Sequence, residues 1–421
     1  MFRDGAARVG CQSALAFVPQ KVAVLQINLY IQSSMFSRRT NWNLSQNQYT
    51  QALADFRASG RKLLDLTMSN PTEVGLHFES GRLLSALSDS RGLEYEPVAK
   101  GLLEAREAVG TYYGEKGIEI SPEQIFLTVS TSEAYGFAFR LLCDPGDEVL
   151  VPQPSYPLFE FLADLQDVKL VPYELIYDHG WQIDFHSLEC AITSKTRAVL
   201  IVHPNNPTGS FVKQAEKTLL DRICADRELA VVADEVFLDY SLGKGDELSF
   251  AGSRGALTFA LSGLSKISAL PQMKLAWMVV SGPEKLAREA TERLEVIADT
   301  YLSVNAPVQW ALPELLDSRR TIQQQLRTRV QRNLAILDGQ LQQQQLCHRL
   351  LVEGGWYAVL RVPVTRTDEE LAIELLEREG VLVQPGHFYD FASNGYLIVS
   401  LITPEQEFQV GIVKVLKHFA G

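Results

Sequence analysis

The chain has 421 residues, 46% of them hydrophobic, a size that exceeds one ordinary core and predicts two domains with a substantial interior. The net charge of −12 opposes a nucleic-acid-binding surface, and no run approaches the roughly 18 apolar residues of a membrane span. Five widely spaced cysteines, an odd number without a metal-ligand pattern, indicate reduced thiols in a cytoplasm.

The first 34 residues differ in character from the rest of the chain. The stretch 11–32 is moderately apolar and follows Arg3 and Arg8, as in a signal peptide. Lys21 interrupts that stretch, however, and no clear small-residue cleavage site follows it. We therefore expect Met35 to be the natural start and residues 1–34 to be an unstructured extension.

Seven apolar runs alternate with helical stretches between residues 71 and 318. This alternation predicts an α/β fold, in which a large domain has a seven-stranded, mostly parallel sheet between helices. The predicted strands lie near residues 124–128, 148–152, 168–172, 197–202, 229–233, 257–261 and 276–280.

The character of the chain changes from about residue 319, where a long polar helix begins and extends to about residue 345. The remaining elements are shorter, and their mixture predicts a smaller α+β domain over residues 319–421. Strands are expected near residues 356–362, 381–384 and 396–401, and helices near residues 367–379 and 404–419.

A polar segment, Ser130-Thr131-Ser132, follows the first predicted strand and opens an apolar helix that runs to about Cys143. Free N–H groups and the positive end of the helix dipole make such a junction an anion site, and the three hydroxyls add donors. A phosphate group would fit there. The alternative is an ordinary N-cap, with Glu133 in the first turn.

Two further segments follow predicted strands with polar side chains. Asn206, in the string Asn-Asn-Pro-Thr-Gly, offers an amide that can donate to a phenolic oxygen, although a plain turn would also explain these residues. Asp234 ends a continuous apolar strand. A carboxylate there is costly to bury unless a cation such as a protonated pyridine nitrogen meets it. A cap at the strand end is the alternative interpretation of Asp234.

Lys266 lies in a Ser-rich segment after the predicted strand 257–261. Its amine would stand at the carboxyl end of that strand, where open parallel sheets hold ligands, and a lysine there can form an imine. Taken alone, Lys266 would be interpreted as a solvated surface lysine. The convergence of four such segments at one sheet edge favours a pyridoxal phosphate site.

From about Asn41 to the C-terminus, this ordered set of motifs resembles the class I/II aminotransferases, fold-type-I enzymes that use pyridoxal 5'-phosphate and include aspartate aminotransferase. The resemblance implies that Lys266 is the Schiff-base lysine and that Asp234 pairs with the pyridine nitrogen. It also implies that Asn206 donates to the cofactor's 3-oxygen and that Tyr156 stacks on the ring, a contact of about 1 kcal/mol. The residues that would hold the phosphate are Ser130, Thr131, Ser132, Ser265 and Lys274.

The resemblance further implies a homodimer, because Tyr95 is similar to the tyrosine that reaches the cofactor of the neighbouring subunit. The active site would lie at the subunit interface, and residues 35–70 would join the small domain. Candidates for substrate binding are Asn70, Tyr357 and Arg361. The last two lie two pleats apart on one predicted strand and so share a face, although a solvent-facing Arg361 is the alternative.

Three positions depart from the family pattern. Phe237 replaces a tyrosine that donates to the cofactor's 3-oxygen, so the imine is expected to hold its proton more tightly. Lys274 replaces an arginine, which gives the phosphate a point charge in place of a bidentate fork. Ile398 stands where the family has the arginine that clamps the substrate α-carboxylate. Either another cation binds that carboxylate, or the substrate is not an ordinary α-amino acid.

These parts predict a pyridoxal phosphate-dependent aminotransferase that moves an amino group from an amino acid to a 2-oxo acid by a ping-pong mechanism. A lyase or an oxidative deaminase on the same scaffold is the first alternative, motivated by Phe237 and Ile398. A non-catalytic ligand sensor is the second, although only a short, non-basic segment precedes Asn70. Alanine, glutamate, aromatic and basic amino donors are all compatible with the sequence.

Overall fold

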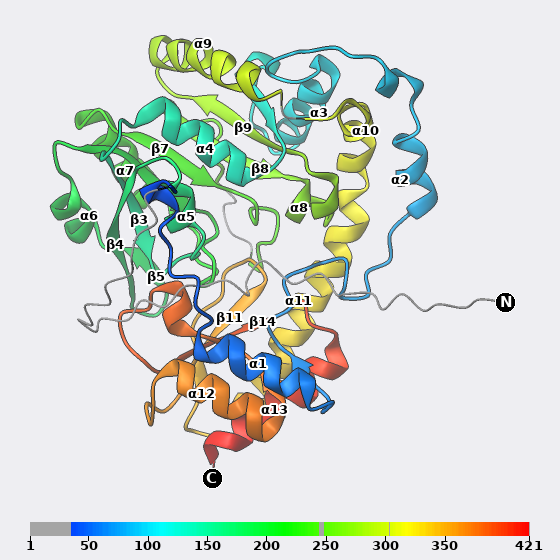
Figure 1. Cartoon of the computed structure of the whole chain (residues 1–421), viewed down its shortest axis with the longest axis vertical. Coiled ribbons are helices and arrows are strands. Elements are labelled where there is room, and N and C mark those ends of the chain that lie inside the picture. Colours follow the sequence, from blue (N-terminus) through cyan, green and yellow to red (C-terminus); the bar gives the residue numbers. More distant parts are fainter. Residues whose placement is uncertain (1–34, 244–247, 303, 421) are drawn as a thin grey trace.

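The computed structural model describes residues 35–243, 248–302 and 304–420. A large sheet with helices on both faces lies next to a smaller group of strands and helices formed mainly by the C-terminal part of the chain (Figure 1). The expected extension, residues 1–34, lies outside the described residues.

The large sheet has eight strands in the order β2-β9-β8-β7-β6-β3-β4-β5. Strand β9 runs antiparallel to β2 and β8, and β5 runs antiparallel to β4, whereas the other neighbours are parallel. The carboxyl ends of β2, β3, β6, β7 and β8 therefore meet at one edge. The strands are β2 (Ile125–Thr128), β3 (Glu148–Gln153), β4 (Lys169–Tyr177), β5 (Trp181–Ile183), β6 (Thr196–Val202), β7 (Ala230–Asp234), β8 (Thr258–Gly263) and β9 (Ala276–Ser281).

The predicted count of seven strands is one short, because β5 was missed. This strand has three residues and pairs with the end of β4, where Tyr177 lies opposite Trp181. A three-residue strand is too short to show the alternation by which strands are recognised in a sequence. The α/β class and the seven other strands are confirmed.

Both faces of the large sheet are buried, which explains why its strands are continuous apolar runs. Along β6, Ala198 and Leu200 pack under α4, α5 and α9, while Val199 and Ile201 pack under α6 and α7. The helices of this part are α2 (Ser80–Ala86), α3 (Leu103–Gly114), α4 (Thr131–Leu142), α5 (Phe159–Asp164), α6 (Phe185–Ala191), α7 (Gln214–Asp226), α8 (Leu264–Ile267), α9 (Glu284–Tyr301) and α10 (Ala306–Asp317).

The C-terminal part has a four-stranded antiparallel sheet in the order β10-β11-β14-β13. Helix α1 (Gln48–Ala58) packs against α12, and β1 (Leu64–Asp65) pairs with β12 (Val381–Leu382), so the N-terminal segment lies beside these elements (Figure 1). The division into domains after residues 70 and 318 stays a prediction. The other elements are α11 (Arg319–Leu341), β10 (His348–Arg349), β11 (Tyr357–Arg361), α12 (Asp368–Glu374), a π-helical turn (Leu375–Glu379), β13 (Gln384–Pro385), β14 (Tyr396–Ser400) and α13 (Glu405–Ala420).

The two parts touch closely where Gly209 meets the segment before β11. Gly209 has a φ of +71°, and a Cβ atom on it would lie 2.5 Å from the carbonyl oxygen of Gly354. The N–H of Glu353 donates to the carbonyl of Gly209 at 3.2 Å. Glycine is required here because no side chain fits between the two backbones. This contact fixes the loop that carries Asn206 against the strand that carries Tyr357.

Candidate active site

A cavity of about 260 Å³ opens at the edge of the large sheet where the carboxyl ends of its strands meet. Loops and helix ends after β2, β3, β6, β7 and β8 each contribute to its wall, and the C-terminal part closes it from the other side. Sequence-predicted residues that line it are Thr131, Ser132, Tyr156, Asn206, Asp234, Ser265, Lys266 and Tyr357.

Lys266 occupies the single turn of α8 that follows β8. Its backbone is held by Tyr240, whose hydroxyl donates to the Lys266 carbonyl at 2.7 Å. The amine Nζ lies 4.9 Å from the ring centroid of Trp356 and 5.6 Å from that of Phe237. Burial lowers the pKa of Lys266 to about 8, although the charge of Asp234 acts in the opposite direction. Most of this amine is therefore still protonated near physiological pH, but its neutral fraction is far larger than that of an ordinary lysine.

Asp234 is the last residue of β7 and is buried. One carboxylate oxygen accepts the N–H of Val236 at 3.1 Å, and the other accepts the hydroxyl of Tyr135 at 2.9 Å. Burial raises the pKa of Asp234 to about 6, whereas these two hydrogen bonds and the charge of Lys266 act to lower it. The carboxylate is thus held in one orientation and stays largely ionised at neutral pH.

The N-terminus of α4 also faces the cavity. Ser130 is its N-cap, and the Ser130 hydroxyl accepts the N–H of Glu133 at 3.1 Å, while the Glu133 carboxylate accepts the N–H of Val129 at 2.9 Å. The ordinary capping role considered for Ser130 is therefore present. Thr131 and Ser132, the first residues of the helix, line the cavity beside the positive end of the helix dipole.

An aromatic ring and an amide complete this wall. Tyr156 lies edge-on to Phe159, with ring centroids 6.0 Å apart, and both rings line the cavity. Asn206 is buried, and its side-chain oxygen has no hydrogen-bond partner among the residues that the structure describes. A buried amide oxygen without a hydrogen-bond partner is costly unless a ligand donates a hydrogen bond to it.

Five predicted site residues do not line this cavity. Besides Ser130, Lys274 is exposed in a left-handed conformation with a φ of 51°, and Arg361 is exposed at the end of β11. Asn70 closes a local turn with its side chain. Tyr95 is 79% exposed and lines a separate hollow. Within one chain, these five side chains thus lie outside the cavity wall.

Ile398 is fully buried in the middle of β14. It lies opposite Val359 of β11 and Gln384 of β13 within the four-stranded sheet. Apart from Lys266, no cation lies in the cavity wall of the described chain, and Asp234 is the only other charged residue there.

Several residues of the wall were missed by sequence reasoning. Tyr135 lies three residues after Ser132 on α4, and this helical spacing places both on one face, so a closer study of the helix would have found it. Ser69 directly precedes the predicted site residue Asn70, whereas Tyr389 ends a 3-10 turn, Gly386–Tyr389, and both reach the cavity through the fold. No sequence signal distinguishes them.

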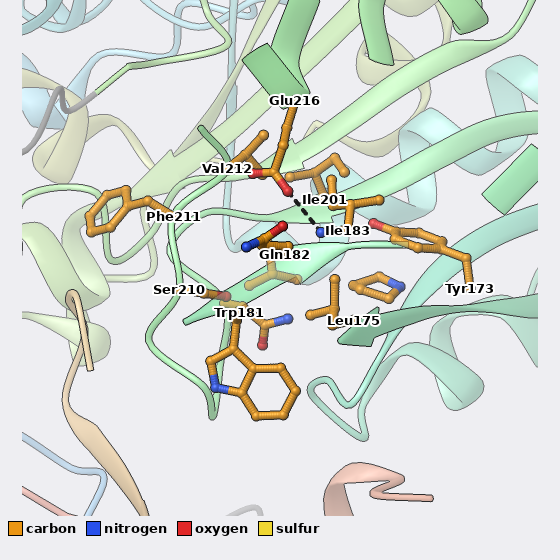
Figure 2. Close-up of a pocket in the computed structure, with 13 residues that line it drawn as sticks. Tyr173, Leu175, Trp181, Gln182, Ile183, Ile201, Ser210, Phe211, Val212 and Glu216 are labelled. Carbon is orange, nitrogen blue, oxygen red and sulfur yellow. Dashed lines mark hydrogen bonds between the residues drawn. The ribbon is translucent and has the colours of Figure 1, made fainter. Parts of the chain in front are cut away.

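A second cavity, of about 20 Å³, lies between β5 and the segment after β6 (Figure 2). It has room for about one water molecule. Its acidic residue, Glu216, accepts the N–H groups of Ile183 at 2.8 Å and Lys213 at 2.7 Å, so its carboxylate is occupied in holding the local backbone. We regard this cavity as a packing feature rather than a ligand site.

Comparison with known proteins identifies the family of the chain. A family model for aminotransferase class I and II matches residues 41–409. The chain belongs to this family. The resemblance from about Asn41 onward, predicted from the motifs, is thereby confirmed. Among the described helices of this aminotransferase, none has the length and apolarity needed to cross a membrane.

Relatives of this aminotransferase cover most of its length. Glutamate-pyruvate aminotransferase of Haemophilus influenzae is 26% identical over 387 residues, which are 86% of this chain and 91% of the relative. Alanine aminotransferase of Mycobacterium tuberculosis is 27% identical over 375 residues, covering 82% of this chain and 83% of the relative. A solved structure of alanine aminotransferase from Pyrococcus furiosus, 24% identical, has a TM-score of 0.82 over 91% of this chain and 99% of its own.

The fold prediction is confirmed by a further solved structure. Aspartate aminotransferase of Thermus thermophilus, a double mutant, is 23% identical and has a TM-score of 0.80 over 91% of this chain and 99% of its own. The predicted aminotransferase activity agrees with the family and with the names of the relatives.

Proposed function

We propose that this aminotransferase uses pyridoxal 5'-phosphate to move an amino group from an amino acid to a 2-oxo acid by a ping-pong mechanism. The observation that carries the proposal is the placement of a half-buried lysine, Lys266, and a buried aspartate, Asp234, in one cavity. The adjoining helix N-terminus fits an anionic group of a ligand, and the Asn206 side-chain oxygen, which has no partner among the described residues, fits a ligand group that donates a hydrogen bond.

The proposed cofactor-binding residues divide by the part of the cofactor that they would hold. Thr131, Ser132 and Ser265 would bind the phosphate, and Asn206 the 3-oxygen. Tyr156 would cover the ring face. When bound, pyridoxal phosphate supplies a ring that accepts the electron pair released at the substrate α-carbon. Ser130 and Lys274, which lie outside the cavity wall, would contribute to phosphate binding only indirectly.

Two side chains of this chain would hold or transfer protons in the reaction. Asp234 would keep the pyridine nitrogen protonated, because the ionised carboxylate favours a positive charge beside it. Lys266 would first hold the cofactor covalently and then, once displaced by the substrate amine, move a proton between the substrate α-carbon and the cofactor's 4'-carbon. A pKa of about 8 suits this exchange at neutral pH.

We also propose a homodimer with the active site at the interface, in the cytoplasm. Tyr95 and its neighbour Leu93 are 79% and 91% exposed, and Leu302, beside the same hollow as Tyr95, is 64% exposed. A patch of large apolar side chains is typical of a protein contact surface. The hollow that Tyr95 lines shares no residue with the Lys266 cavity of the same chain. This separation is expected if Tyr95 contacts the cofactor of the neighbouring subunit. The four cysteines of the described chain are free thiols, which suits the expected cytoplasmic location.

Cofactor uptake is expected to depend on pH through Lys266. Only the neutral amine attacks a carbonyl, and the neutral fraction increases as pH rises through about 8. Uptake of pyridoxal phosphate by cofactor-free protein should thus accelerate about tenfold between pH 6.5 and 7.5 and level off above pH 8 to 9. Stopped-flow absorbance measures this rate. In Asp234→Asn protein the half-point should move lower, and a wild-type half-point near the ordinary 10.5 would contradict the proposal.

The reaction itself is tested with purified protein, a panel of amino donors and a 2-oxo acid. The names of the relatives make glutamate with pyruvate, and the reverse pair of alanine with 2-oxoglutarate, the first pairs to examine. We expect stoichiometric amino exchange, with each half-reaction observable alone. Release of ammonia without formation of a second amino acid would favour the lyase or deaminase alternative. The departures from the family pattern at Phe237 and Ile398 are the reason for considering that alternative.

A further inference from the structure

One face of the four-stranded sheet borders the substrate side of the cavity. Tyr357 of β11 lines the cavity and pairs with Ser400 of β14, and two residues along each strand Val359 pairs with Ile398. Gln384 of β13 pairs with Ile398 from the other side. Paired residues and residues two apart point to the same face of a sheet. Tyr357, Ile398 and Gln384 therefore stand side by side on the face toward the cavity.

The polar groups around this face are hydroxyls and an amide. Tyr389, also in the cavity wall, donates its hydroxyl to the side-chain oxygen of Gln384. Tyr357 lies within hydrogen-bonding reach of Ser69, a third residue of the wall. The three side chains come from separate segments, β11, the turn after β13 and the segment after β1, and all three line the cavity.

These groups carry no charge. Burial raises the pKa of the Tyr357 and Tyr389 phenols above the usual range, so both remain neutral at every physiological pH. Because Tyr389 donates its proton to Gln384, it offers the cavity an acceptor oxygen. The charged residues of the described wall, Asp234 and Lys266, lie where the cofactor and the reacting carbon would be. The end of the cavity lined by Ser69, Tyr357 and Tyr389 is thus rich in hydrogen-bond partners, and no guanidinium of the described residues lines it.

Neutral and ionic partners discriminate differently between substrates. A guanidinium gains two charge-assisted hydrogen bonds from a carboxylate and loses most of that gain when the carboxylate becomes an amide. A hydroxyl donates a stronger hydrogen bond to a carboxylate than to an amide or alcohol oxygen, but the carboxylate is far more costly to desolvate, and the two effects offset each other. Selection against uncharged substrates is therefore weak where hydroxyls form the subsite.

We infer that the group next to the amino-bearing carbon is received by Ser69, Tyr357 and Tyr389, and that this aminotransferase also takes uncharged substrates, namely α-amino amides and amino alcohols. This inference rests on the proposed function. The reaction balances as for an amino acid. The donor's C–N bond is replaced by a C=O bond whose oxygen comes from water, and the nitrogen passes to the oxo acceptor.

The inference is tested by matched donors that differ in the head group. Holoenzyme is mixed with L-alanine or L-alaninamide, and with L-phenylalanine or L-phenylalaninol, and the cofactor absorbance is followed through the first half-reaction. We expect second-order rate constants within about tenfold of each other in each pair, a difference of one hydrogen bond or less. A preference of about a thousandfold or more for the carboxylates would overturn the inference, since it would require a cation at the subsite.

A binding measurement separates this inference from the proposed function. The unreactive pair 3-phenylpropanoate and 3-phenylpropanamide is titrated into the protein by calorimetry, which needs no turnover. Similar dissociation constants support the inference, and a carboxylate preference above about a hundredfold contradicts it. Failure of every donor to react, with no cofactor attached to Lys266, would instead reject the proposed function while leaving the binding result to judge the subsite.

Two substitutions sharpen the result. Ile398→Arg should move the preference toward 3-phenylpropanoate by about a hundredfold, with Ile398→Leu as the control for repacking. Because a buried arginine endangers folding, Tyr357→Phe provides an independent measurement. It should weaken both ligands about equally, by roughly tenfold for one lost hydrogen bond. A loss confined to the carboxylate would show that Tyr357 selects for charge and would contradict the inference, and no loss at all would remove Tyr357 from the subsite.

Discussion

Lys266→Ala is expected to abolish borohydride-stable attachment of the cofactor and to lower kcat/KM for amino exchange by about 10⁴-fold or more. The reason is that one amine performs two tasks, covalent attachment and proton transfer at the α-carbon. Its partial burial and its pKa of about 8 prepare it for both. Mass spectrometry after borohydride reduction locates the label, and initial rates give the loss.

Lys274→Ala is the matched control for this experiment. Lys274 lies eight residues along the same segment but is exposed and outside the cavity wall. Its replacement should leave the label on Lys266 and should weaken phosphate binding at most modestly. A label that persists in the Lys266→Ala protein, or that moves to Lys274 in the wild type, would reject the assignment.

Asp234→Asn is expected to lower the rate of the first half-reaction by about 10² to 10³-fold, the usual loss when one oriented electrostatic partner of a reacting group is removed. Tyr135→Phe removes only one hydrogen bond to that carboxylate, which is present at 2.9 Å. It should raise the pKa of Asp234 further and reduce the half-reaction rate by about tenfold or somewhat more. Stopped-flow rates as a function of pH measure both effects.

Tyr112→Phe tests whether the Tyr135 effect is more than lost stability. Tyr112 is also a buried tyrosine whose hydroxyl donates to a buried aspartate, Asp239, at 3.0 Å, but this pair lies away from the cavity. Both substitutions should lower the free energy of unfolding by about 1 to 3 kcal/mol. Only Tyr135→Phe should change the half-reaction. Equal kinetic effects of the two variants would show that Tyr135 acts through stability alone.

The centre of the candidate site could be predicted from the sequence because each residue follows a strand of a parallel sheet. Asp234 and Lys266 come directly after buried apolar runs, and parallel strands bring their carboxyl ends to one edge. The alternation of strands with helices along the chain is sufficient to predict that these residues lie together. The site roles themselves remain proposals.

The periphery of the site could not be predicted in this way. Tyr389 and Ser69 reach the cavity because the C-terminal sheet packs against the large one, a long-range contact that no local pattern encodes. Lys274 has a left-handed backbone and an exposed side chain, and its phosphate-binding role stays a prediction. Strand β5 was missed because three residues are too few for a periodic signal.

Cofactor handling and substrate choice are proposed to reside on different sheets of this aminotransferase. The residues assigned to the cofactor come from the edge of the eight-stranded sheet, and those assigned to the head group come largely from the C-terminal part. Mutations on β11, β13 or β14 can therefore retune which amines are accepted while the chemical machinery stays intact. With this arrangement, the range of amino donors can change during evolution while the catalytic residues are retained.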